Sequence, residues 1–187
     1  MSQRGRLRYC RGLAGAVLLA LFAVSPSVAT SETKAASDFS AFDLSGAEHR
    51  LSELRGSVTI VTLWATWCFP CRYEMPLLER VYRKLQGRGL RVVAVAVDDK
   101  LDAVKRYQAD KNFSFDVLFD PTGISKAALG VRGVPTTFVM SSNHRFLPMR
   151  DPISGEQLTL IDNPLSWERP EMVEQLEALL SQRETAQ

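Results

Sequence analysis

Apolar and polar positions along the middle of the chain predict strands separated by helices. Residues 58–64 (VTIVTLW) are β-branched or apolar without glycine or proline, as a buried strand requires. Residues 90–97 (LRVVAVAV) are almost wholly apolar, which is typical of a central parallel strand covered on both faces. Between these strands, one helix face is formed by Cys71, Met75, Leu78, Tyr82 and Leu85.

Shorter elements are predicted on both sides of this centre. In chain order they are a short strand from Phe39 to Leu44 with a turn at Ser45-Gly46, a helix through Leu101, Val104 and Tyr107, an aromatic-rich strand over 113–119, a helix from Ile124 to Leu129, a strand from Thr136 to Met140 whose hairpin partner starts at Phe146-Leu147, and a final helix from Pro170. Asp98 and Asp99 are interpreted as caps of the helix that follows them, with a functional acid as the alternative. The periodicity is lost over 148–167.

The N-terminus has the pattern of a targeting segment. Four arginines precede the apolar run from Leu13 to Val24, and small residues follow at Ser27-Val28-Ala29. The run is shorter than the roughly 20 apolar residues of a membrane-spanning helix. We therefore expect residues 1–29 to be a cleaved signal peptide, with an uncleaved membrane anchor as the alternative. Residues 30–37 would then be a flexible leader, 38–183 one domain and 184–187 a tail.

Removing that segment changes the charge and the cysteine count. The chain has 23 basic and 21 acidic residues, and four arginines but no acids lie in 1–29, which leaves 19 against 21, or −2. A domain so near neutrality gives no support to nucleic-acid binding. Of the three cysteines, Cys10 lies in the removed segment. A single cysteine pair in an exported chain indicates a redox-active dithiol more than a fold stabilised by disulfides.

The two remaining cysteines, Cys68 and Cys71, stand where the predicted helix begins. Free backbone N–H groups and the helix dipole stabilise an anion there, which lowers the pKa of a thiol and favours attack on a disulfide. Cys68 would attack, and Cys71, which we expect to be more buried, would resolve the mixed disulfide. A zinc site is disfavoured because only His49 and His144 could complete it. A structural disulfide and a copper(I) site using the two cysteines with His144 remain open.

Residues 64–76 read WATWCFPCRYEMP, and the context of this motif is specific. Residues 39–140 resemble the extracytoplasmic thioredoxin-like proteins of the TlpA/ResA/DsbE (CcmG) type. The resemblance implies an α/β thioredoxin fold, with a central mixed β-sheet flanked by helices, an N-terminal β-hairpin extension and a central insertion within 90–130. Pro76 is similar to the proline that kinks the active-site helix in this family.

The resemblance also implies site residues. Val134 and Pro135 match the cis-proline loop that faces the cysteines, so that they and Trp67 would contact the substrate. Thioredoxins carry a buried Asp six residues before the first cysteine, and Thr62 stands at that position here. Because threonine is no base near neutral pH, Glu74 is the candidate third catalytic group beside Cys68 and Cys71. The alternative for Glu74 is a solvated surface carboxylate.

The family resemblance implies a periplasmic or otherwise extracytoplasmic thiol-disulfide oxidoreductase without cofactor or metal. Phe69-Pro70 places no histidine or charge between the cysteines, which favours a reductant over a thiol oxidase. The expected partners are a membrane thiol-electron donor and disulfide-containing exported proteins such as apocytochrome c. Contact with the membrane is expected only if the N-terminal segment is retained. A peroxiredoxin fits the Trp-Cys-x-x-Cys context poorly.

Overall fold

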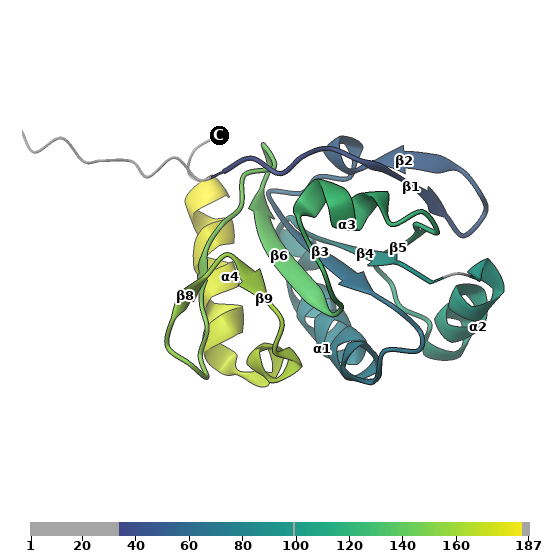
Figure 1. Cartoon of the computed structure of the whole chain (residues 1–187). Coiled ribbons are helices and arrows are strands. Elements are labelled where there is room, and N and C mark those ends of the chain that lie inside the picture. The colour runs from purple at the N-terminus through teal and green to yellow at the C-terminus, as the bar shows by residue number, and fades with distance from the viewer. Residues whose placement is uncertain (1–33, 99, 185–187) are drawn as a thin grey trace, which may run out of the picture. The chain divides into compact units, whose positions relative to one another are not determined.

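A computed structural model describes residues 34–98 and 100–184 (Figure 1). The predicted signal peptide, Cys10, Asp99 and residues 185–187 lie outside the described residues. The main elements are β1 (Ser40–Asp43), β2 (Glu48–Arg50), β3 (Val58–Trp64), α1 (Phe69–Leu85), β4 (Leu90–Ala96), α2 (Leu101–Lys111), β5 (Asp116–Phe119), α3 (Ile124–Leu129), β6 (Thr136–Ser141) and α4 (Pro170–Glu184). Between β6 and α4 lie β7 (Met149–Arg150), β8 (Gln157–Leu158), β9 (Leu160–Ile161) and the 3₁₀ helix η3 (Pro164–Glu168).

The main sheet has the strand order β2-β1-β5-β4-β3-β6-β9. β4 runs parallel to β3 and to β5, whereas β1 and β6 run antiparallel to their neighbours β5 and β3. The expected mixed sheet and N-terminal hairpin are therefore confirmed, and the chain has a thioredoxin fold. The two central strands are buried on both faces, as their apolar sequences require.

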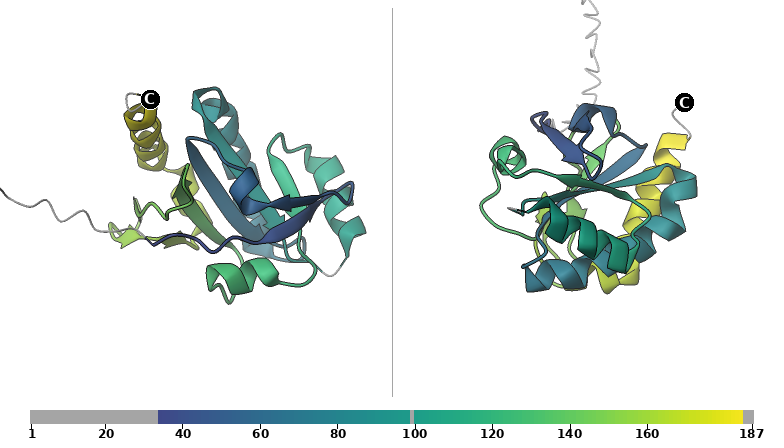
Figure 2. Two further views of the ribbon diagram at one scale, coloured as in Figure 1. Left: turned by 90° about the horizontal axis from the view of Figure 1, so that it is seen from above. Right: turned by 90° about the vertical axis from the view of Figure 1, so that its right-hand side faces the viewer.

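Helices cover both faces of the sheet, and alternate residues of each strand point to different layers. One core layer joins Ile60 and Trp64 of β3 to α1, α4 and Val104 of α2. The other joins Val61 and Leu63 to β1 and α3. The views in Figure 2 place α1 and α4 on one side of the sheet and α3 on the other. Thr62 therefore faces α1.

Helix α1 matches the predicted apolar face and continues through Pro76. Its buried residues include Cys71, Met75 and Leu78, and their side chains pack on β3 and β4. The final helix begins with Pro170, where the missing N–H costs no helical hydrogen bond. Helices α1 and α4 thus pack on the same face of the sheet.

Two predicted strands differ from the structure. The strand expected over 113–119 begins only at Asp116, where pairing with Val93 of β4 starts. Phe113 and Phe115, before it, stack on each other within the core, with ring centroids 5.1 Å apart. The segment starting at Phe146 makes a single bridge to Met140 rather than a strand. The edge of β6 is instead paired by β9, which returns from the segment without periodicity.

The predicted leader, 30–37, is described from Lys34 onward, where its backbone makes hydrogen bonds. The Ala36 N–H donates to the His144 carbonyl at 2.8 Å, and the Phe146 N–H donates to the Lys34 carbonyl at 3.0 Å. Backbone pairing with the turn after β6 thus fixes the leader from Lys34 onward, which a small polar sequence does not reveal.

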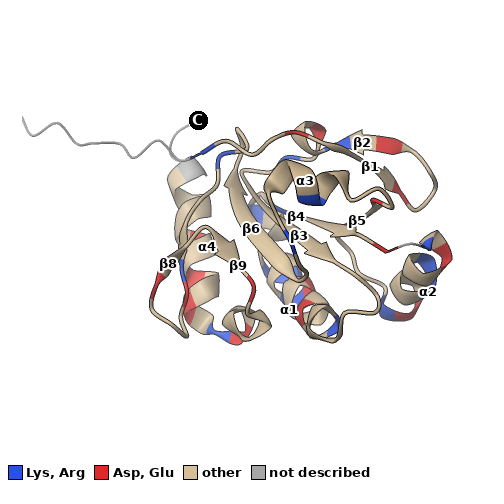
Figure 3. Ribbon diagram, in the orientation of Figure 1, with Lys and Arg blue, Asp and Glu red and all other residues tan. Residues whose placement is uncertain are grey.

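Charged residues lie mainly on helices, loops and edge strands, and β3 and β6 carry none (Figure 3). In the described ranges, 34–98 and 100–184, no helix is both long and apolar enough to cross a membrane.

Candidate active site

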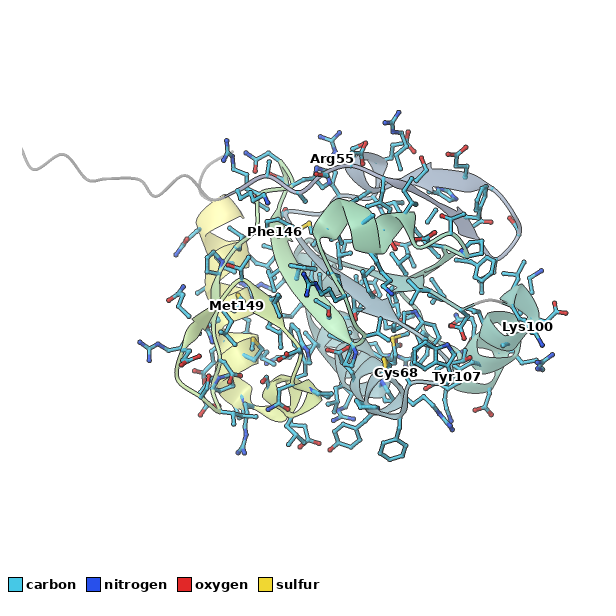
Figure 4. The ribbon with its side chains drawn as sticks, in the orientation of Figure 1. Arg55, Cys68, Lys100, Tyr107, Phe146 and Met149 are labelled. Carbon is cyan, nitrogen blue, oxygen red and sulfur yellow. A yellow bond between two sulfur atoms is a disulfide. The ribbon has the colours of Figure 1, made fainter. Side chains whose placement is uncertain are left out.

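The active-site turn joins the end of β3 to the start of α1. Cys68 is the N-cap residue of α1, and its Sγ accepts a hydrogen bond from the Cys71 N–H at 3.2 Å. The two cysteines form a disulfide, with their Cα atoms 5.2 Å apart (Figure 4). Cys71 has no exposed surface and Cys68 keeps 5% of its own, so the predicted difference in burial is confirmed. A sulfur at this position faces the positive end of the helix dipole.

Asp98 anchors this turn, and the predicted helix cap is wrong. Its carboxylate accepts hydrogen bonds from the Thr66 N–H at 3.0 and 3.1 Å and from the Thr66 hydroxyl. Helix α2 instead starts after Lys100, without a side-chain cap. Because β3 and β4 are parallel, their C-terminal ends meet at the same edge of the sheet. The end of β4 can therefore hold the loop that leads to Cys68.

The loop before β6 lies opposite Cys68. β6 pairs antiparallel with β3, so that Thr136 lies opposite Leu63 and the preceding residues reach the active-site turn. The Val134-Pro135 peptide bond is cis, as the family resemblance implied. The Val134 carbonyl oxygen lies 3.6 Å from the Cys68 Sγ. A backbone acceptor thus stands beside the reactive sulfur.

Glu74 is fully buried, and the surface-carboxylate interpretation is wrong. One carboxyl oxygen accepts from the Thr62 hydroxyl at 3.1 Å, and the other accepts from the Thr137 hydroxyl at 2.9 Å and the Trp167 Nε1–H at 2.8 Å. Burial raises the pKa of Glu74 to about 7, and the three hydrogen bonds oppose part of that rise. Its role in proton transfer stays a prediction.

Sequence reasoning missed two residues of this site, Thr137 and Trp167, and it named Asp98 as a helix cap, with a functional acid as the alternative. Trp167 is on η3 and lies 93 positions from Glu74 in the sequence. No periodicity marks its segment. Thr137 could have been found, because strand alternation from Pro135 places its side chain on the α1 face.

An aromatic rim borders the cysteines. Trp67, Phe69 and Tyr73 keep 68%, 81% and 44% of their surface exposed. Beside them is a cleft of about 320 Å³, lined by Phe69, Arg72, Tyr73, Pro76, Tyr107 and Lys111. Figure 4 shows Tyr107 at the same end of the sheet as Cys68. The charged residues that line the cleft are both cations.

The copper(I) alternative with His144 does not fit the geometry. His144 follows Ser141, which pairs with Val58 at the opposite end of β3 from Cys68. At about 3.3 Å per residue, the six steps along β3 separate the two ends by roughly 20 Å. No three His, Cys, Asp or Glu side chains among the described residues are grouped for a metal ion.

The sequence and the fold both match known proteins. Residues 33–145 match the model of the AhpC/TSA family. The thiol-disulfide oxidoreductase ResA of Geobacillus thermodenitrificans is 34% identical over 122 residues, which are 65% of this chain and 69% of that protein.

Two crystal structures from Chlorobium tepidum are also similar. One protein, assigned as the thiol:disulfide interchange protein DsbE, is 30% identical, with a TM-score of 0.61 over 81% of this chain and 96% of that chain. The other, a thiol:disulfide interchange protein of the thioredoxin family, is 26% identical, with a TM-score of 0.64 over 81% of this chain and 99% of that chain. The chain therefore belongs to the AhpC/TSA family and is a thioredoxin-like thiol-disulfide oxidoreductase of the ResA and DsbE kind, in which Cys68 and Cys71 form a disulfide.

Proposed function

We propose that this oxidoreductase is exported and reduces disulfides in exported proteins, with apocytochrome c as the leading client. The observation that carries the proposal is the placement of Cys68, which caps α1 beside the Val134 carbonyl and next to an exposed aromatic rim. A sulfur so placed is stabilised as a thiolate and can be reached by an extended chain.

The reaction begins with the reduced protein. The Cys68 thiolate attacks one sulfur of the client disulfide, which breaks the client S–S bond and forms a mixed disulfide. The released client thiolate takes up a proton. Cys71 then loses its proton and attacks the Cys68 sulfur, which forms the Cys68–Cys71 bond and frees the second client thiolate. Two electrons have passed to the client, and a membrane thiol donor would have to restore the dithiol.

Glu74 is the proposed proton acceptor for Cys71. It lies three residues after Cys71 on α1, which places both side chains on adjoining positions of one helix face. Its pKa of about 7 allows it to change protonation state near neutral pH, as efficient acid–base catalysis requires. Thr62, which stands at the thioredoxin Asp position, donates a hydrogen bond to Glu74. The buried acid, which is on the strand in thioredoxins, is thus on α1 in this chain and contacts the same strand position.

The client is proposed to bind as an extended chain along the cis-proline loop. The backbone of Val134 would pair with it by strand addition, and Trp67 and Pro135 would contact its side chains. The exposed ring of Phe69, between the two cysteines, extends this surface toward the cationic cleft.

The direction of electron flow follows from what stabilises the thiolate. Phe69 and Pro70 supply neither a histidine nor a positive charge, so the reduced form is less favoured than in strong oxidants. We therefore expect a potential well below that of DsbA-type oxidants. Equilibration of the Cys68/Cys71 pair with glutathione measures it, and a value near about −120 mV would assign the protein as a thiol oxidase instead.

The client is tested by trapping. The Cys71→Ser variant should accumulate a mixed disulfide through Cys68 with an oxidised peptide that carries the apocytochrome c Cys-x-x-Cys sequence. The Cys68→Ser variant is the matched control and should capture none. Equal capture of unrelated disulfide peptides would argue against apocytochrome c as the preferred client.

A further inference from the structure

The C-terminal segment over 148–167, whose role the sequence does not reveal, contributes a side chain to the active site. η3 brings Trp167 against α1, and its Nε1–H donates to the Glu74 carboxyl at 2.8 Å. Trp167 is 3% exposed and Glu74 is fully buried. Because water cannot readily replace a donor at such a site, this contact has a large effect on the carboxyl group.

We propose that Trp167 is a positioning residue for thiol-disulfide exchange, whose indole N–H fixes the Glu74 carboxyl and stabilises its ionised form. The proposal rests on the proposed function, in which Glu74 moves a proton for Cys71. It assigns the 148–167 segment a part in the chemistry.

The side chains of Glu74, Thr62, Thr137 and Trp167 differ in the hydrogen bonds that they can donate and accept. The hydroxyls of Thr62 and Thr137 lie 2.8 Å apart, and each also contacts one carboxyl oxygen of Glu74. A hydroxyl both donates and accepts, so the two threonines can rotate to serve the carboxyl in either protonation state. The indole N–H of Trp167 only donates. It therefore favours the carboxylate, whereas the threonines hold the group in both states.

Few other ionisable groups stand around Glu74. β3 and β6 present threonines and apolar residues to it and carry no charge. On α1 the cysteines lie one turn earlier. Glu168 of η3 accepts a hydrogen bond from the exposed Tyr73. Asp151, which follows β7, accepts one from Ser166 of η3, beside Trp167. Among the described groups, burial and the three hydrogen bonds are the causes that set the protonation of Glu74.

The test follows the Glu74 carboxyl carbon by ¹³C NMR as a function of pH in the oxidised protein. Its signal is assigned by its absence in Glu74→Gln. We expect Trp167→Phe to raise the midpoint by about one pH unit, a tenfold change in the ionisation constant. Trp64→Phe is the matched control, because Trp64 is also buried but its indole N–H has no hydrogen-bond partner among the described residues. It should leave the midpoint in place.

A second measurement needs no Trp167 variant. In the wild-type protein the indole N–H resonance of Trp167 should titrate with the same midpoint as the Glu74 carboxyl and should lose this titration in Glu74→Gln. The proposal is overturned if the Trp167 resonance does not titrate with the midpoint of Glu74. It is also overturned if the Glu74 midpoint is unchanged in a folded Trp167→Phe protein. Neither readout uses disulfide exchange, so a failure of the proposed function would appear separately, as absent client reduction.

Discussion

Replacing Glu74 by glutamine is expected to stabilise the oxidised protein at neutral and alkaline pH. Burial places the pKa of Glu74 at about 7, above its ordinary value of 4.5. Between these values the folded protein retains a proton that the unfolded chain releases, so folding stability falls as pH rises through this window. Glutamine keeps the shape and the acceptor oxygen but carries no charge, and the variant has no such pH dependence from this position.

The magnitude follows from the difference of about 2.5 pH units between 4.5 and about 7. At about 1.36 kcal/mol per unit, wild type should lose about 3 kcal/mol from pH 4.5 to 8 relative to Glu74→Gln. Urea unfolding of both proteins at several pH values measures this, with the disulfide intact. Stabilities that differ by the same amount at pH 4.5 and pH 8 would refute the reasoning, because the carboxyl would then titrate alike in the folded and unfolded states.

The remaining predictions concern the turn and the rim. Asp98→Ala should lower the free energy of unfolding by about 2–3 kcal/mol in urea titrations, because it leaves the Thr66 N–H and hydroxyl without their acceptor. Asp98→Asn keeps one acceptor oxygen and should cost less. Equal stability of wild type and both variants would contradict the role of Asp98 in holding the active-site turn. Trp67→Ala should slow reduction of a client disulfide about tenfold, equal to about 1.4 kcal/mol, and should change stability by less than about 0.5 kcal/mol because the ring is exposed; the matched change Leu165→Ala, at an exposed apolar residue on η3 outside the rim, should leave the rate unchanged. A rate that Trp67→Ala does not alter would remove Trp67 from the client surface.

The central strands, the active-site helix and the place of both cysteines could be predicted from local patterns. β3 and β4 are buried on both faces, so nearly all of their residues are β-branched or apolar, and the repeat from Cys71 to Leu85 marks one face of α1. Cys68 at the start of α1 follows directly from the order of strand, turn and helix.

What could not be predicted depends on contacts between distant parts of the chain. Asp98 has the residue type and the position expected of a helix cap, but the parallel pairing of β3 and β4 brings its carboxylate to Thr66 instead. The pairing of β9 with β6 and the contact of Trp167 with Glu74 arise from a segment with neither helical nor strand periodicity. A local pattern cannot specify such pairings, because tertiary packing decides them.

The pH dependence of Cys68 alkylation in reduced Cys71→Ser tests the central claim most directly, since every proposed step starts from a thiolate at the beginning of α1. The account predicts that the reaction of Cys68 with iodoacetamide has an ionisation midpoint well below about 8.5, the pKa of an ordinary cysteine thiol. A midpoint at or above that value, with no faster exchange than a simple thiol at neutral pH, would contradict it.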